Sequence, residues 1–317
     1  MAATLDIVIV NWNSGGLLRE CLLSIAAADR AGIMLERVVV VDNASSDGSE
    51  NVPEVAGLPV QVIRNSENRG FAAACNQGAT ESRADYLLFL NPDTRLFADS
   101  LAATIAFLEK DGAGDVGICG IQLVDEEGKV SRSCARFPTL RTFVYRALGL
   151  DKLYPGRFHG HLMLDWDHRQ SREVDQVIGA FFLVRSALFA RLGGFDERFF
   201  VYFEEADFSL RAARLGWKSY YLTAARAYHK GGGSSEQAKA KRLLYSLTSR
   251  ILYGFKHFSG LDAVLLLLFA VTIEPVSLIL WYFIKRSVRD VRESSIGYGL
   301  FYLSLPRLFR ALWEHRG

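Results

Sequence analysis

The chain has 317 residues, of which 50% are hydrophobic and 23% are charged. This composition excludes a mainly disordered chain, and the length allows one large α/β domain with an appendage or two modest domains. The formal net charge of +2 argues against a protein that binds nucleic acid over a broad surface.

The cysteines and the N-terminus both indicate a reducing compartment. Cys21, Cys75, Cys119 and Cys134 form no CxxC pair and match no zinc-site spacing. The first residues, MAATLDIVIVNWN, lack the basic and long apolar regions of a signal peptide. We therefore expect a cytosolic enzyme body whose cysteines pack as small core residues.

Short β-rich runs alternate with helix-compatible segments over the first part of the chain. Strands are expected at 5–10, 37–42, 60–64 and 86–90, and residues 177–184 are again apolar. Helices are expected after Ser14, which can cap the first of them, at 70–80 and at 100–110. This order predicts an α/β fold with a mostly parallel sheet flanked by helices.

Polar side chains stand at the carboxyl ends of these expected strands, where open sheets bind their ligands. Asn11 and Asp42 end the first two strands, and Asn91-Pro92-Asp93 follows the fourth. One strand-end carboxylate often only caps a turn, but several in one domain favour a binding site. No GxGxxG or GxxxxGK[ST] loop is present, so we expect Mg²⁺ or Mn²⁺ on oxygen ligands to neutralise a bound diphosphate.

Carboxylates alternate with aromatic residues between Phe195 and Arg211. Carboxylates held against apolar rings have a raised pKa, which suits a general base. The alternative is an acidic helix face exposed to solvent.

The C-terminal part is apolar and basic. Residues 239–317 carry 12 Lys and Arg against 5 Asp and Glu. The apolar run 261–284 is long enough to cross a bilayer, but Glu274 and Pro275 interrupt it. We expect a membrane-embedded or re-entrant hairpin, with a single spanning helix or a soluble helical subdomain as the alternatives. Residues 300–313 are amphipathic and suit a membrane surface.

Six segments and a late histidine, taken in order, resemble the family-2 glycosyltransferases of the GT-A fold. They are VIVNWNSGGLLRECLLSI, VVVVDNASSDGS, NRGFAAACNQG, LLFLNPDT, GAFFLVR and GGFDERFFVYFEEADFSLR, followed by His229. Within the family they look most like bacterial rhamnosyltransferase-type enzymes that build cell-surface polysaccharides. The resemblance implies a GT-A catalytic domain over 1–235, and we expect a helical membrane-associating region over 236–317.

The resemblance implies a nucleotide-sugar donor. The positions that it implies for donor binding are Asn11, Asn13, Asp42, Asn68, Arg69, Gly70 and Asn91. Asn11 and Asp42 match positions that hold the nucleobase and ribose, and 68–70 match a loop that closes over the nucleotide.

A metal site and a base are implied as well. Asp93 keeps the last acid of the family's DxD motif and is the expected metal ligand, together with His229. Glu204-Glu205 stands where the family has Glu-Asp, so Glu205 is the expected base and Asp207 the second candidate.

The expected function is inverting transfer of a sugar, with rhamnose as the first candidate, to a hydroxyl of a glycan or lipid-linked acceptor. We expect it at the cytoplasmic face of the cell membrane, without nucleic acid as a partner. Two alternatives stay open. One is a polyprenyl-phosphate sugar synthase, whose acceptor phosphate Arg132, Arg136 and Arg141 would contact. The other is an inactive nucleotide-sugar-binding subunit.

An irregular segment holds a further polar cluster, made of His159, His161, Asp165, Asp167 and His168. Its spacing meets no metal-site rule, so we expect a solvated loop, with an acceptor-binding loop or a structural zinc site as alternatives. Trp166 and Gly179-Ala180 are candidates for the acceptor side.

Overall fold

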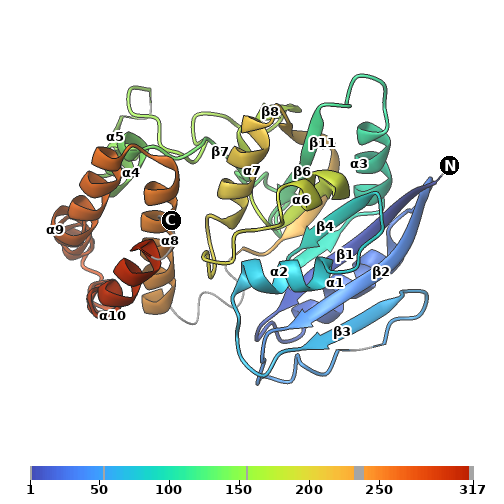
Figure 1. Cartoon of the computed structure of the whole chain (residues 1–317), viewed down its shortest axis with the longest axis horizontal. Coiled ribbons are helices and arrows are strands. Elements are labelled where there is room, and N and C mark those ends of the chain that lie inside the picture. Colours follow the sequence, from blue (N-terminus) through green and yellow to red (C-terminus); the bar gives the residue numbers. More distant parts are fainter. Residues whose placement is uncertain (1, 53, 155, 232–238, 314–317) are drawn as a thin grey trace. The chain divides into compact units, whose positions relative to one another are not determined.

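The computed structural model describes residues 2–52, 54–154, 156–231 and 239–313 (Figure 1). The chain divides into two compact units. The first consists of Met1–Phe137, Trp166–Glu197 and Glu204–Ser234, and the second of Pro138–Asp165, Arg198–Phe203 and Ser235–Gly317. The second unit thus takes in two segments that precede the C-terminal region in the sequence. The division at residue 235 stays a prediction.

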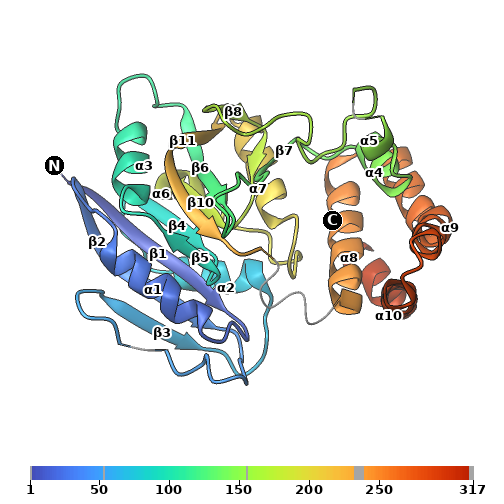
Figure 2. The ribbon, with the colours of Figure 1, turned by 180° about the vertical axis from the view of Figure 1, so that it is seen from behind.

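A large mixed sheet forms the centre of the first unit (Figure 2). Its strands in the described residues are β1 (Ala3–Asn11), β2 (Ile33–Asp42), β3 (Val60–Arg64), β4 (Tyr86–Leu90), β5 (Thr94–Leu96), β6 (Val116–Val124), β8 (Arg172–Val174), β10 (Phe181–Arg185) and β11 (Lys218–His229). Their order is β3-β2-β1-β4-β10-β6-β11-β5, and β8 pairs with β11. β7 (Cys134–Ala135) and β9 (Gln176–Val177) form a separate small ladder.

The two halves of the large sheet differ in strand direction. β1 pairs in parallel with β2 and β4, and β2 with β3. β10 runs antiparallel to β4 and to β6, and β5 runs antiparallel to β11. The α/β fold is as expected, but continuous parallel pairing is limited to β3-β2-β1-β4, and in the second half of the sheet only β6 and β11 pair in parallel.

Helices cover both faces of the sheet. Side chains alternate between the two faces along each strand. The buried apolar strands therefore present side chains on both faces that helices must cover. The helices of the first unit are α1 (Leu17–Ala27), α2 (Phe71–Ala79), α3 (Ser100–Leu108), α6 (Ser186–Arg191) and α7 (Glu204–Arg214). Leu22 of α1 and Ile105 of α3 share one buried cluster with Ile7 of β1. On the other face, Gly78 of α2 lies so close to β1 that a Cβ there would be 2.4 Å from Val8 Cγ1.

A cluster of phenylalanines supports α6 and α7 on the same face as α2. Its members are Phe89, Phe182, Phe189, Phe195 and Phe208, whose ring centroids lie 4.9 to 6.5 Å apart in the contacting pairs. This cluster accounts for some of the aromatic residues that the sequence places among carboxylates: they form core behind the acidic helix.

Most expected elements are present, and the expected cap of the first helix is not. β3 and β4 have the expected bounds, and the four cysteines are buried and unpaired with one another. No side chain caps α1, which begins after Gly16. Ser14 fails as the cap because its hydroxyl donates to Asn11 Oδ1 at the end of β1 instead.

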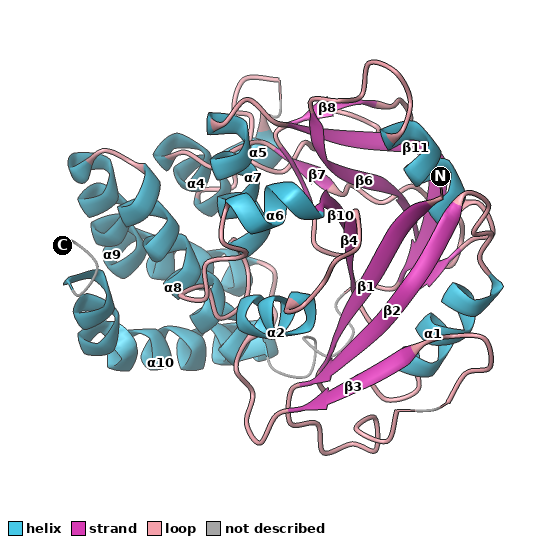
Figure 3. Cartoon of the chain, turned by 45° about the vertical axis from the view of Figure 1, so that its right-hand side comes forward, coloured by secondary structure: helices cyan, strands magenta, loops and turns pink. Residues whose placement is uncertain are grey.

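The second unit is helical (Figure 3). Its described helices are α4 (Leu140–Ala147), α5 (Leu150–Leu153), α8 (Lys239–His257), α9 (Gly260–Ile284) and α10 (Val288–Trp313). α9 is one continuous helix with Pro275 inside it, so the expected hairpin is wrong. Glu274 is accommodated because its Oε1 accepts from Arg250 Nη1 of α8 at 3.0 Å. Within the described residues, only α9 is long and apolar enough to cross a membrane.

Candidate active site

Asn11 and Asp42 lie side by side at the carboxyl edge of the sheet, where they are register partners on β1 and β2. Asn11 Nδ2 donates to Asp42 Oδ1 at 2.8 Å and to the Ser49 carbonyl at 3.0 Å. Asp42 Oδ2 accepts from the Ser45 N–H at 3.2 Å. Both of these expected donor-binding side chains are buried. Burial and hydrogen bonds together fix their positions at this edge of the sheet.

Asn13 joins the loops that follow β1 and β2. Its N–H donates to Ser45 Oγ at 3.0 Å, and its Oδ1 accepts from the Ser46 N–H at 2.8 Å. Its φ of 49° lies in the left-handed region, which Asn tolerates better than most residues. Asn13 therefore holds the shape of this edge.

Asn43 organises the expected nucleotide loop at 68–70, and the sequence analysis missed it. Its Nδ2 donates to Asn68 Oδ1 at 2.9 Å and to the Gly70 carbonyl at 3.1 Å. Its Oδ1 accepts from the Arg69 N–H at 3.1 Å. The place of Asn43, directly after Asp42 in VVVVDN, was the signal that could have identified it.

Asp93 and His229 come together because β11 pairs with β5, which places His229 opposite Thr94. Asp93 Oδ1 lies 3.3 Å from His229 Nε2, and both side chains are nearly buried. A carboxylate oxygen and an imidazole nitrogen are ligands that Mn²⁺ accepts. No group of three or more His, Cys, Asp or Glu able to hold a metal occurs among the described residues. The pair therefore fits an ion that takes its remaining ligands from a substrate and water.

Glu204 and Glu205 occupy the first turn of α7. Burial raises the pKa of the Glu204 carboxyl well above its usual range, and the charge of Glu205 adds to this. Burial also raises the pKa of Glu205, although hydrogen bonds from its own backbone and from that of Gly179 oppose the rise. One oxygen of each carboxyl is buried without a hydrogen-bond partner among the described residues. Such a pair suits proton transfer, because burial favours the protonated form of both carboxyls.

The strand-end loop and the acid pair are joined through Gly179-Ala180, which precede β10. The Ala180 carbonyl accepts from the Asn91 N–H at 3.1 Å and from Thr94 Oγ1 at 3.3 Å. Gly179 hydrogen-bonds Glu205 through its backbone. The structure therefore brings Asn91, Asp93, His229 and Glu205 into one connected region.

Asp207 also lies in the first turn of α7 but contacts a different partner. It is fully buried, and its Oδ2 accepts from Arg211 Nε at 2.8 Å. Arg211 also donates to the Leu192 and Gly194 carbonyls at 2.7 and 2.8 Å. The ion pair anchors α7 to the loop before it.

The segment that leads into α7 belongs to the second unit and has an unusual backbone. Tyr202 and Phe203 both have φ of 69°, a left-handed conformation that costs bulky residues energy. Ser249 Oγ of α8 donates to the Val201 carbonyl at 2.8 Å, and the Phe203 ring lies 5.6 Å from that of Tyr253. α8 therefore holds the two residues that immediately precede Glu204 in the chain.

Two family models match the chain. The model described as "Glycosyl transferase family 2" matches residues 6–163, and "Glycosyl transferase family group 2" matches residues 86–289, which is more than half of the chain. The chain belongs to the family-2 glycosyltransferases. Its activity class is therefore glycosyl transfer.

Relatives of this family-2 glycosyltransferase include two bacterial rhamnosyltransferases. One is the N-acetylglucosaminyl-diphospho-decaprenol L-rhamnosyltransferase of Mycobacterium tuberculosis, 26% identical over 82% of this chain and 87% of the relative. The other is the rhamnosyltransferase WbbL of Escherichia coli K12, 29% identical over 53% of this chain and 61% of the relative. The expected likeness to rhamnosyltransferases is confirmed.

Solved structures confirm the GT-A fold. The mannosyltransferase PcManGT of Pyrobaculum calidifontis, in complex with GDP-Man and Mn²⁺, has a TM-score of 0.52 at 15% identity and covers 100% of this chain and 82% of its own. S. aureus TarS 1–349, in complex with UDP-GlcNAc, has a TM-score of 0.51 at 15% identity, with 94% and 92% covered. These identities are low enough that the likeness speaks for the fold alone.

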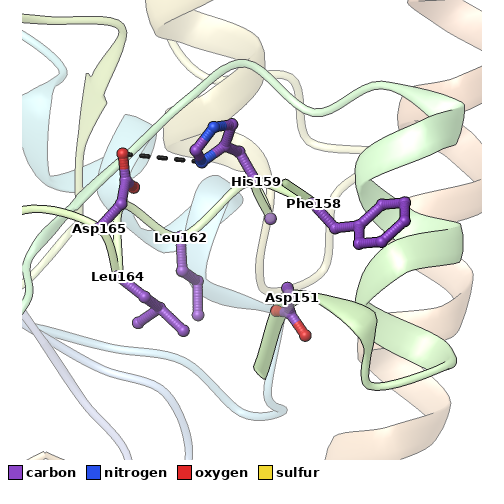
Figure 4. Close-up of a pocket in the computed structure, with 7 residues that line it drawn as sticks. Asp151, Phe158, His159, Leu162, Leu164 and Asp165 are labelled. Atoms are coloured by element: carbon purple, nitrogen blue, oxygen red, sulfur yellow. Dashed lines mark ion pairs between the residues drawn. The ribbon is translucent and has the colours of Figure 1, made fainter. Parts of the chain in front are cut away.

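The histidine-rich segment of this glycosyltransferase is not a solvated loop throughout. His168 is fully buried, and its Nε2 accepts from the Cys134 N–H at 3.2 Å while its ring stacks on Trp166. The expectation is wrong there because His168 satisfies buried backbone groups. His159 is exposed and lies in a small pocket of the second unit with Asp165, its Nδ1 3.9 Å from Asp165 Oδ2 (Figure 4). That pocket contains none of the expected donor, metal or base residues.

Proposed function

We propose that this protein transfers a sugar from a nucleoside-diphosphate donor to a hydroxyl of a lipid-linked glycan acceptor, with inversion at the sugar C1. The observation that carries the proposal is the acid pair of Glu204, which is buried, and Glu205, which is partly buried and is hydrogen-bonded by the Gly179 backbone next to the Ala180 carbonyl that holds the loop of Asp93. The names of the mycobacterial and E. coli relatives support rhamnose as the first candidate sugar and polysaccharide synthesis as the context.

The donor nucleotide would lie at the carboxyl edge of β1 and β2. Asn11 and Asp42 would contact the base and ribose, and the 68–70 loop held by Asn43 would close over them. Asn13 would keep the loops in place, and Asn91 would contact the donor beside the metal. This edge is where open α/β sheets bind ligands.

Asp93 and His229 are the residues that would hold Mg²⁺ or Mn²⁺. When bound, the ion neutralises the negative charge that collects on the leaving nucleoside diphosphate. Asp93 supplies the charged oxygen, and the near burial of both side chains limits competition from bulk water.

Glu205 would act as the base. Burial raises the pKa of both carboxyls, so the pair would retain a proton at higher pH than solvated glutamates do, and Glu205 in its carboxylate form would accept the proton of the acceptor hydroxyl. That hydroxyl oxygen forms a bond to C1 from one face as the bond from C1 to the diphosphate oxygen breaks on the other, which inverts the anomeric centre. Asp207 would position α7 through Arg211, since a carboxylate held by a guanidinium is a weak proton acceptor.

The C-terminal helices would keep the enzyme at the cytoplasmic face of the membrane, where a lipid-linked acceptor is within reach. We assign the catalytic role to residues 1–235 and the membrane role to residues 236–317. The apolar helix α9 and the basic residues after it support this assignment.

The test is sugar transfer by the native chain, with Mn²⁺, from a panel of nucleotide sugars to a polyprenyl-diphosphate-linked glycan. We expect a product of inverted anomeric configuration by NMR. Glu205→Gln should lower kcat about 10²–10⁴-fold with an unchanged donor Kd, whereas the exposed control Glu127→Gln should leave both unchanged. Donor binding without transfer or hydrolysis by the native chain would indicate the inactive subunit, and transfer only to polyprenyl phosphate would indicate the synthase.

A further inference from the structure

α9 presents a long apolar face to solvent. Its exposed large residues recur every three or four positions along much of the helix: Leu261, Val264, Leu265, Leu268, Ile273, Val276, Leu280, Phe283 and Ile284. Their exposed fractions run from 42% to 74%. We call this set the α9 stripe. Exposed apolar area of this extent marks an interaction surface.

The opposite side of α9 packs on the rest of the second unit. Ala263, Leu266 and Ala270 are buried, and the ion pair of Glu274 with Arg250 ties the middle of α9 to α8. Further along, Tyr302 Oη of α10 donates to the Val271 carbonyl at 2.7 Å. Ser277 Oγ donates to the Ala147 carbonyl of α4 at 3.0 Å. α9 is therefore fixed along its length to three other helices.

Those neighbouring helices are too polar for the interior of a bilayer. α8 exposes Lys239, Lys241 and Arg242, and α10 exposes basic side chains at intervals. If α9 crossed a membrane while keeping its contacts, these charges and the Arg250–Glu274 pair would enter the hydrocarbon, where charged groups are strongly disfavoured. The stripe suits contact with acyl chains, and exposed apolar residues of α10 such as Val288 and Leu303 could add to that contact.

Basic residues flank the stripe. They are Lys285 and Arg286 at the end of α9, and Arg289, Arg292, Arg307 and Arg310 on α10, all of them exposed. The Lys285 ammonium lies 4.9 Å from the centre of the Trp281 ring, which places a cation and an interfacial aromatic side by side. This arrangement complements an anionic lipid surface.

We propose that the second unit binds one leaflet of an anionic bilayer, with α9 lying in the plane of the interface and its stripe in the acyl region. α9 does not cross the membrane. The inference rests on the membrane role proposed above and places α9 in the interface, in place of the hairpin, spanning helix or soluble subdomain considered from the sequence.

Cysteine labelling separates the two modes, because the four native cysteines are buried and give little background. Gly260→Cys places a thiol in open space at the start of α9, and Lys285→Cys places one just after its end. In sealed inside-out membrane vesicles, we expect a membrane-impermeant maleimide to label both variants without detergent. Labelling of one end only after detergent would overturn the interfacial mode.

Vesicle flotation tests the membrane role separately. We expect the native chain to float with vesicles of 70% phosphatidylcholine and 30% phosphatidylglycerol, and less with phosphatidylcholine alone or in 0.5 M NaCl. Leu268→Glu and Val276→Glu should each lower binding about tenfold. The matched control Leu23→Glu changes a leucine of similar exposure, 48%, in the first unit and should bind as the native chain does.

Failure of the membrane role and failure of the interfacial position of α9 give different results. A native chain that does not float overturns both the membrane role and this inference. A chain that floats but has the two ends of α9 on opposite sides overturns the interfacial mode alone. A lipid-free dimer that the stripe variants convert to monomers would assign the stripe to a second copy of the chain.

Discussion

At the scale of single residues, the proposed chemistry depends on two pairs. Asp93 and His229 supply one oxygen and one nitrogen 3.3 Å apart, and Glu204 and Glu205 lie together in the first turn of α7. The first pair is expected to bind a cation and the second to exchange a proton. Each pair therefore has its own test.

The metal pair can be tested by donor binding. Asp93→Ala and His229→Ala should each lower the affinity for a nucleoside diphosphate in the presence of Mn²⁺ by about tenfold or more, because the ion loses one of two protein ligands. Calorimetry with and without EDTA measures the effect, and in EDTA the variants and the native chain should bind alike. An Asp93→Ala protein whose Mn²⁺-dependent affinity equals that of the native chain would contradict the assignment.

The acid pair can be tested by pH. A base works only when deprotonated, so a raised pKa of Glu205 moves the acidic limb of kcat/KM upward. We expect activity to fall, as pH decreases, at a pH above 4.5, the ordinary value for a glutamic acid. The profile of kcat/KM between pH 4 and 9 measures this limb. An acidic limb at or below 4.5 would mean that a more solvated carboxylate is the base.

At the scale of elements, the sequence determined the parallel half of the sheet more fully than the rest. β3 and β4 are short apolar runs between turn residues, so their bounds could be read directly. The pairing of β5 with β11 joins segments far apart in the chain, and no local pattern encodes it. The closeness of Asp93 to His229 was therefore available only through the resemblance to a family.

The place of Asn43 after Asp42 could have marked it as a candidate, but the hydrogen-bond partners of Asn43 and Ser249 could not be read from the sequence. Each acts by hydrogen bonds to backbone groups of a distant loop, and a polar residue of that kind looks like any other until the loop is placed. The acid pair was recognisable from its motif, but its burial depends on the packing of α7.

The segment before α7 gives a prediction at this scale. Ser249→Ala removes the hydrogen bond that α8 gives to the Val201 carbonyl, next to the left-handed residues Tyr202 and Phe203. We expect kcat to fall several-fold, about 1 kcal/mol in activation free energy, with an unchanged donor Kd. Steady-state kinetics and calorimetry measure the two quantities.

Two controls separate this effect from general damage to α8. Ser246→Ala changes a serine of the same helix and should retain native kinetics. Ser249→Thr keeps a hydroxyl and should recover most of the lost turnover. Equal losses in Ser246→Ala and Ser249→Ala would contradict a specific role for the Val201 contact.

At the scale of the whole molecule, the stability of the protein depends on pH through His161, a largely buried histidine of the second unit. Burial lowers the pKa of His161 to about 4, and the nearby charges of Arg146 and Arg250 act in the same direction, against Asp151. The native state thus keeps His161 neutral at pH values where the unfolded chain binds a proton. Stability is therefore complete above about pH 6.5 and declines as the pH falls toward 4.

This decline is measurable. Between pH 7.5 and 4.5 the free energy of unfolding should fall by up to about 3 kcal/mol from this residue. His161→Gln should reduce that pH dependence in urea denaturation, whereas His159→Gln, at an exposed neighbour, should keep it. An unchanged slope in His161→Gln would assign the acid sensitivity to other groups.

The interleaving of the two units along the chain has a consequence for synthesis. Phe143 contacts Phe203 and Phe258, and Phe203 contacts Tyr253, so segments 138–165 and 198–203 are completed only by α8 and the turn after it. A ribosome delivers those segments well before residues 239–257. Domains fold as units during translation. The aromatic residues of these two segments in the nascent chain therefore lack their contacts with Tyr253 and Phe258 until α8 and the following turn emerge. Release of a fragment that ends near residue 235 would leave them without partners, and such a fragment should depend on chaperones in a way that the full-length chain does not.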